Sequence, residues 1–192
     1  MPNATNTHTN IAPLQTKTQT TTQTTIGFFH HYGLGDNLIA IKALYLAKKA
    51  YHCRLIIFGN ALLKEILDFV DFMDSTDEIL DIGALSKDSL ATIAKYRCDF
   101  FLLSNPKSQY IRLLSPLDTP IITALKFASF FSTKTKYPPL LFFDKYRKLN
   151  AKDALCMLVR LVDKNAFDEF VGNILRTQNL TRQKAKTGGG AT

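Results

Sequence analysis

The sequence predicts an α/β fold in which helices cover both faces of a Rossmann-like, open parallel sheet. The first observation is that short apolar runs alternate strictly with helical patterns between residues 26 and 123, which is typical of βαβ units. The second is that these runs are continuous rather than alternating, as in strands buried on both faces. The third is that 46% of the 192 residues are hydrophobic, which is enough for the core of one domain.

Five apolar runs are the expected strands, and each is bounded by residues that favour turns. They cover residues 26–31, 54–58, 77–82, 99–104 and 119–123. Parallel strands need crossover connections, so the segments between these runs must hold helices.

Three of the expected helices carry a local signal at one end. The first carries Lys48 and Lys49 in its last turn, where positive charges suit a helix C-terminus. Ser86 is the expected N-cap of another helix, and Pro106 suits the first turn of the next. The expected helices cover residues 37–51, 61–70, 86–96, 106–114, 150–163 and 166–176.

The two ends of the chain differ from this pattern. Residues 1–25 contain ten Thr and no acid, so they bury too little apolar surface to offset the entropy of ordering. We expect a disordered tail there, one domain over 26–176, and a second disordered, Gly-rich tail over 177–192. Within the domain, the aromatic and basic segment 126–150 is expected to be rich in loops.

Charge is distributed unevenly along the chain. Residues 65–88 carry eight acids against one base, whereas residues 89–192 carry 17 Lys and Arg against seven acids. A basic half favours an anionic partner such as a nucleic acid, a phosphorylated glycolipid or a membrane surface. A solvated surface of mixed charge is the alternative.

The cysteine pattern and the hydropathy of the chain indicate the cellular compartment in which it is expected. Cys53, Cys98 and Cys156 lie far apart without a CxxC motif, which argues against a disulfide framework and against a zinc site. A reduced, cytosolic chain is expected. The most apolar stretch, residues 121–131, is interrupted by Lys126 and is shorter than the ~20 residues of a spanning helix.

The stretch GLGD, from Gly33 to Asp36, follows the first expected strand. It therefore lies at the carboxyl edge of the sheet, where open α/β sheets bind ligands. A dinucleotide fingerprint would need a third glycine, but Leu38 stands there, and the second strand ends without the acid that binds ribose. No Gly-Lys-Ser/Thr follows, so the stretch is not a P-loop.

Asp36 has two interpretations at this stage. It is a good residue for an N-cap of the following helix. Alternatively, the glycines before it let a ligand approach the backbone, and the helix dipole favours a charged carboxylate that could take a proton from an attacking hydroxyl. His30 and His31 point to opposite faces of a strand, so we expect no shared metal. One of them is expected near the site and the other in packing, and neither is expected to be catalytic.

The stretch GLGDNLIAIKALYLAKKAYHCRLIIF resembles the opening of glycosyltransferase family nine, the ADP-heptose:lipopolysaccharide heptosyltransferases. The shared features are Gly35-Asp36, a helix ending at Tyr51, and the strand RLIIF. Ala40 and Ile41 depart from the Thr-Pro of many members. CDFFLLSNPKSQYIRLL resembles the family's fourth strand and the turn after it, and LNAKDALCMLVRLVD resembles the helix that closes the N-terminal domain.

The resemblance covers about residues 26–175 and implies the N-terminal half of a GT-B glycosyltransferase, which binds the acceptor. It implies inverting, metal-independent transfer with Asp36 as the general base. The acceptor is a phosphorylated lipid A-core saccharide, which suits the basic half of the chain. The expected acceptor-binding residues are Gly33, Gly35, Lys107, Ser108 and Arg112, with Lys134 and Lys136 as further candidates.

The nucleotide-sugar domain of the family is expected to be missing from this chain, which would then be inactive alone. No cofactor is expected, because the ADP-heptose-like donor would bind that second domain. The resemblance implies lipopolysaccharide core biosynthesis in the cytoplasm, with peripheral association at the inner membrane and no nucleic-acid partner. The alternatives are a non-catalytic module that binds an anionic glycolipid or another anionic partner, and a standalone Rossmann enzyme.

Overall fold

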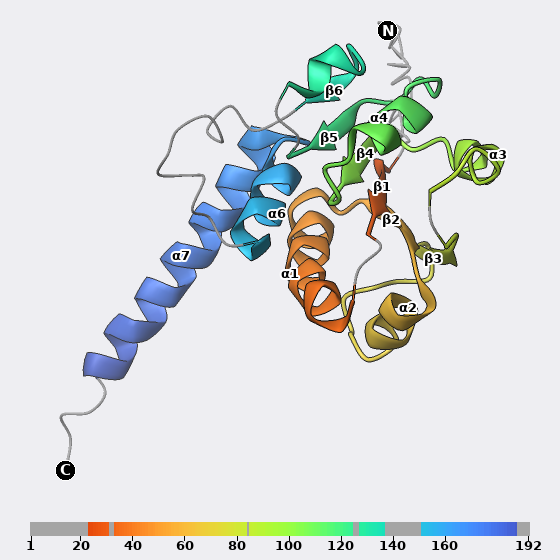
Figure 1. The fold of residues 1–192 in the computed structure, drawn as a ribbon. Coiled ribbons are helices and arrows are strands. Elements are labelled where there is room, and N and C mark those ends of the chain that lie inside the picture. Colours follow the sequence, from red (N-terminus) through yellow and green to blue (C-terminus); the bar gives the residue numbers. More distant parts are fainter. Residues whose placement is uncertain (1–22, 31–32, 84, 125–126, 137–150, 188–192) are drawn as a thin grey trace, which may run out of the picture.

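The computed structural model describes residues 23–30, 33–83, 85–124, 127–136 and 151–187 (Figure 1). The strands are β1 (Thr25–Phe29), β2 (Arg54–Gly59), β3 (Glu78–Asp81), β4 (Phe100–Leu103), β5 (Ile121–Thr123) and β6 (Thr135–Lys136). They form one six-stranded sheet in the order β3-β2-β1-β4-β5-β6, and every neighbouring pair is parallel. This is the strand order of the Rossmann fold, and it confirms the predicted fold class.

Helices connect these strands and continue past the sheet. They are α1 (Leu34–Tyr51), α2 (Ala61–Leu67), α3 (Leu90–Lys95), α4 (Ser108–Leu114), the short 3-10 helix η1 (Ala128–Phe130), α6 (Ala151–Arg160) and α7 (Lys164–Thr187). Figure 1 shows α1 and α6 together beside the sheet and α7 extending away from it. Within the described residues, no helix is both long and apolar enough to cross a bilayer.

The core consists of two apolar clusters, one on each face of the sheet. On one face Phe28 packs with side chains of α1, α2, α6 and the start of α7. On the other, Phe29 and Phe101 pack with side chains of α3, α4 and η1. Gly27 of β1 lies opposite Phe101 of β4, and a Cβ atom on Gly27 would stand 2.8 Å from Phe101 Cδ1. The central strands are buried on both faces, which is why their apolar runs are continuous.

Several predicted helix boundaries are wrong. The helix over 61–70 ends at Leu67. Ser86 is not an N-cap, because α3 begins at Leu90 and the Ser89 hydroxyl instead donates to the Ser86 carbonyl at 2.8 Å. The turn around Ser86 satisfies its own backbone groups, so the helix starts one turn later.

The C-terminal tail prediction is also wrong in part. The last helix was expected to end at residue 176, but α7 continues to Thr187. Its second half contains no Gly or Pro and is rich in helix formers, so helix propensity sustains it although Leu175 and Leu180 are exposed. Residues 1–22, 188–192 and most of the expected loop segment 126–150 lie outside the described residues.

Candidate functional site

A cavity of about 260 Å³ lies at the carboxyl edge of the sheet. Its walls come from the first turns of α1, from α6 and from the residues that follow β1, β4 and β5. It is lined by His30, Asp36, Ile39, Ser104, Pro106, Ala124, Ala154, Leu155 and Leu158. A mostly apolar pocket with a few converging polar groups, placed where open α/β sheets bind ligands, is the best candidate for a functional site.

Asp36 reaches this cavity from the first turn of α1. The interpretation of Asp36 as an N-cap is wrong, because the helix begins at Leu34 and the N-cap position belongs to Gly33. The first helical hydrogen bond runs from Asn37 N to Gly33 O at 3.0 Å. Asp36 is thus the third helical residue, where the partial positive charge of the helix N-terminus favours a carboxylate.

The Asp36 carboxylate is exposed. Among the residues that the structure describes, it has neither an ion-pair partner nor a hydrogen-bond partner. The fold therefore places this carboxylate in the cavity without engaging it in a contact of its own.

His30 and Ser104 form a polar pair in the wall of the cavity. The Ser104 hydroxyl donates to the Phe29 carbonyl at 2.7 Å, so it accepts from His30 Nδ1, which lies 2.9 Å away. The imidazole also stacks on Phe28, with 5.7 Å between ring centroids. These contacts fix the ring and assign its proton to Nδ1 when the imidazole is neutral.

Sequence reasoning expected one of the two histidines near the site, and His30 lies there. His31 is outside the described residues. Ser104 was missed as a site residue. The available signal was that Ser104 ends the fourth apolar run, whose strand lies beside β1 in this fold.

Gly33 and Gly35 are both exposed. A Cβ atom at either position would meet nothing within 4 Å, and neither residue has a positive φ angle. Packing and backbone conformation therefore explain neither glycine. What both provide is a bare stretch of backbone beside Asp36 that a ligand can approach closely.

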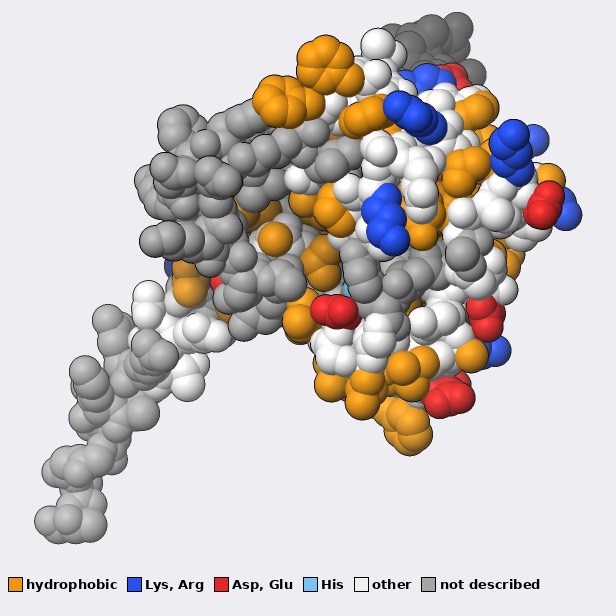
Figure 2. Space-filling view, viewed as in Figure 1, with side chains coloured by type: hydrophobic (Ala, Val, Ile, Leu, Met, Phe, Trp, Pro, Cys, Tyr) orange, Lys and Arg blue, Asp and Glu red, His pale blue; other side chains and the backbone are white. Residues whose placement is uncertain are grey.

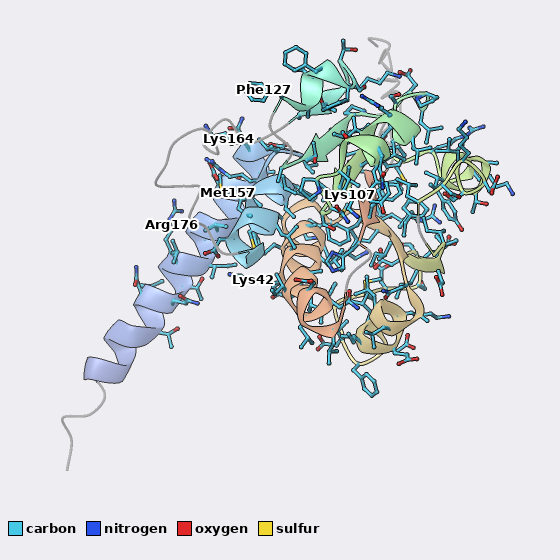
Figure 3. The ribbon with its side chains drawn as sticks, in the orientation of Figure 1. Lys42, Lys107, Phe127, Met157, Lys164 and Arg176 are labelled. Carbon is cyan, nitrogen blue, oxygen red and sulfur yellow. The ribbon has the colours of Figure 1, made fainter. Side chains whose placement is uncertain are left out.

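Lys107 and Ser108 lie at the start of α4, directly after the cavity-lining Pro106. Lys107, which is labelled in Figure 3, occupies the N-cap position of α4. Its Nζ lies 5.7 Å from the centroid of the Tyr110 ring. Arg112 lies one turn further along α4 and stacks on Phe131 at 5.1 Å. The structure thus brings Lys107 and Ser108 close to the rim of the cavity, while Arg112 contacts the η1 segment.

Lys134 and Lys136 lie away from this cavity. Lys134 O accepts from Ile121 N at 3.0 Å at the start of β5, which places Lys134 at the amino edge of the sheet. Its Nζ pairs with Asp118 at 3.1 Å and donates to the Leu117 carbonyl at 3.0 Å. Lys136 stands over the Phe100 ring at 5.4 Å.

The amino edge holds a larger cavity, of about 460 Å³, whose wall includes Arg97, Asp99 and Asp118. Asp99 accepts from the Thr25 backbone N–H at 2.7 Å, and Asp118 pairs with Lys134. Both carboxylates are already engaged in contacts within the protein. The larger volume of this cavity therefore does not make it a better candidate than the cavity beside Asp36.

Thiol and metal chemistry find little support in the described part of the chain. Burial raises the pKa of the Cys53 thiol and of the Cys98 thiol to about 12, so both stay protonated and unreactive near neutral pH. Among the described residues, no group of three His, Cys, Asp or Glu side chains is placed to hold a metal ion.

No protein-family model and no curated protein matches the chain. One solved structure that resembles it is AnUbiX in complex with FMN and dimethylallyl pyrophosphate. That match has a TM-score of 0.43 and 10% identity over 77% of this chain and 93% of the other. Another is a cube-shaped, highly porous protein cage designed by fusing symmetric oligomeric domains, with a TM-score of 0.31 and 12% identity over 88% of this chain and 80% of the other. Both likenesses are too weak to support an argument about function.

Proposed function

We propose that this chain is the acceptor-binding domain of an inverting glycosyltransferase similar to family nine. The observation that carries the proposal is the placement of Asp36. Its carboxylate lines a cavity at the carboxyl edge, at the positive end of α1 and without a partner among the described residues. A carboxylate placed in this way is ready to act on a bound hydroxyl group.

In the proposed reaction Asp36 accepts the proton of an acceptor hydroxyl while the oxygen attacks the anomeric carbon of a nucleotide sugar. The bond to the nucleoside diphosphate breaks, and the configuration at the anomeric carbon inverts. A weak base suits this step because the hydroxyl becomes acidic only as it bonds to the electrophile. The helix dipole stabilises the carboxylate before the reaction.

The proposed acceptor is a phosphorylated lipid A-core saccharide. The apolar wall of the cavity, including Leu155 and Leu158, can pack against the carbon face of a sugar ring, while a few polar groups orient it. Lys107 and Ser108 near the rim supply a cation and a hydroxyl for a phosphate group. A role in lipopolysaccharide core assembly at the cytoplasmic face of the inner membrane belongs to the same proposal.

The test is reconstitution with a second domain. The chain is mixed with a separately expressed donor domain of a family-nine enzyme, ADP-heptose and a detergent-dispersed lipid A-core acceptor, and ADP release is followed. We expect acceptor-dependent ADP release that needs both proteins. Binding of the acceptor to the chain by calorimetry, with no ADP release from the mixture, would contradict a catalytic role.

A second candidate is a non-catalytic module that binds an anionic glycolipid. It is favoured by the excess of bases after residue 89, with 17 Lys and Arg against seven acids. Such a module would bind the acceptor but would release no ADP in the mixture described above, whether or not Asp36→Asn is introduced.

A further inference from the structure

Two phenylalanines project from the fold at η1, one at its N-cap position and one at its last residue. Phe130 is 83% exposed and Phe127 is 57% exposed, and their ring centroids lie 6.0 Å apart. Figure 2 shows two hydrophobic side chains protruding at the top of the molecule, and Figure 3 shows Phe127 on the outer side of η1. The pair forms a raised tip rather than the wall of a groove. Large exposed aromatic side chains that lie together commonly mark an interaction site.

The fold holds these two rings outward. Ala128 is buried and Phe131 packs against the cluster formed by the α3–α4 side of the sheet. In a 3-10 turn, residues three apart lie on the same side, so anchoring Ala128 and Phe131 leaves Phe127 and Phe130 on the other side. The turn is closed by a bond from Phe130 N to Phe127 O at 3.0 Å.

Phe127 adopts a φ angle of 57°, in the left-handed region that a bulky residue rarely occupies. Such a conformation persists only where the surrounding structure enforces it, and it is more frequent at functional positions. The display of the two rings is therefore a fixed feature of the segment.

A cation lies beside this tip. The Arg112 guanidinium lies 5.1 Å from the Phe131 ring centroid, directly beside η1. Among the described residues from 105 to 136 there are four bases and one acid, and that acid, Asp118, is paired with Lys134. The described part of the chain around η1 is thus basic overall, and Arg112 is the cation that contacts it.

A third exposed phenylalanine provides a contrast. Phe69 is 91% exposed, but its neighbours in the chain are the exposed acids Glu65, Asp68 and Asp71. An anionic surface would attract the surroundings of Phe127 and Phe130 and would repel those of Phe69.

We propose that Phe127, Phe130 and Arg112, here called the η1 surface, dock the chain onto an anionic lipid bilayer. Aromatic side chains settle at the level of the headgroups, and binding to a membrane surface increases with buried apolar area and with attraction to anionic lipids. Stable attachment needs both contributions, and the η1 surface offers both. A protruding pair of rings suits insertion into a deformable bilayer. The inference goes beyond the proposed transfer reaction, because a bilayer without any saccharide would suffice.

The first test measures sedimentation of the full chain with vesicles of phosphatidylcholine alone or mixed with phosphatidylglycerol. We expect binding to the mixed vesicles and little binding to the neutral ones. Replacing both rings (Phe127→Ser with Phe130→Ser) should weaken partitioning by about tenfold or more, and Arg112→Gln should weaken it about fivefold. Phe69→Ser is the matched control and should stay within about twofold of the parent.

The second test uses the absence of tryptophan from the sequence. Phe130→Trp introduces one fluorophore at an exposed position, so its folding is not at risk. Its emission should shift to the blue on addition of the mixed vesicles, whereas Phe69→Trp should not shift.

The proposal is overturned if the chain does not bind the mixed vesicles, if the double Ser variant binds them as the parent does, or if Phe69→Trp shifts as much as Phe130→Trp. Binding to duplex RNA in place of vesicles would assign the basic surface to a nucleic acid. The vesicles contain no acceptor and no donor, so these results do not depend on the transfer reaction proposed for Asp36.

Discussion

At the amino edge of the sheet, ionisable side chains form ion pairs and hydrogen bonds within the fold. At the carboxyl edge, the Asp36 carboxylate is not engaged in this way. Lys48 Nζ lies 2.8 Å from Asp77 Oδ1 and 2.7 Å from Asp74 Oδ2, and it donates to the Cys53 carbonyl at 2.9 Å. Asp36 has no such partner among the described residues.

The contacts of Asp77 explain why the amino-edge cluster is structural. Its side chain is fully buried. It accepts from the Leu55 backbone N–H at 2.7 Å and from the Asp74 backbone N–H at 2.8 Å. The carboxylate therefore ties the start of β2 to the loop before β3, with Lys48 neutralising its charge. A buried charge that is paired and hydrogen-bonded contributes to folding, while an exposed, unengaged one remains available to a ligand.

The largest expected effect follows from removing the buried carboxylate. Asp77→Ala leaves Lys48 and two backbone N–H groups without their acceptor, so it should lower the free energy of unfolding by about 3 kcal/mol. Urea denaturation measures this change. Asp36→Ala is the control and should lower it by no more than about 1 kcal/mol, the usual size of a helix-dipole contribution. Equal losses of unfolding free energy for the two variants would contradict the inference that Asp77 is structural and Asp36 is not.

A smaller effect is expected at Gly35, where a substitution should raise stability and weaken acceptor binding. Gly35→Ala adds a Cβ atom where nothing lies within 4 Å. Because alanine favours helix, the free energy of unfolding should rise by roughly 0.5–1 kcal/mol. If a ligand approaches the backbone there, the same variant should bind the lipid A-core acceptor less tightly in calorimetry. Increased stability with unchanged affinity would remove Gly35 from the site.

The smallest effect concerns the dependence of stability on pH. Hydrogen bonds from Lys48 and then from Thr76 hold the pKa of the Asp74 carboxyl well below its usual range. A lowered pKa in the folded state means that the carboxylate contributes stability above the unfolded pKa, about 3.9, and loses it as the pH falls through the folded value.

The parent and Asp74→Asn should therefore differ by a constant amount above about pH 5, and the difference should shrink below about pH 4. Urea midpoints measured across this range test the expectation. A difference that grows on acidification would show that Asp74 does not carry the pH dependence.

Sequence reasoning succeeded where a single physical requirement dominates. Continuous apolar runs predicted the strands because burial on both faces leaves no polar positions. It failed at the start of the first helix, where two glycines concealed the first turn and left the N-cap interpretation of Asp36 open, although Gly33 holds that position. It could not find the pair of His30 and Ser104, because residues 74 positions apart meet only through the pairing of β1 with β4. It also placed the end of the last helix too early, because exposed polar residues were read as a tail.

The most direct test of the role assigned to Asp36 is the rate of ADP release in the reconstituted mixture with Asp36→Asn. This variant keeps the size of the side chain and removes its basicity. The matched control is Asp68→Asn, because Asp68 is an exposed aspartate at the C-terminal end of α2 and does not line the cavity. We predict a loss of at least about tenfold for Asp36→Asn, with acceptor affinity unchanged, and no loss for Asp68→Asn. A rate for Asp36→Asn within twofold of the parent would contradict the proposal and leave Asp36 as a surface carboxylate at the start of α1.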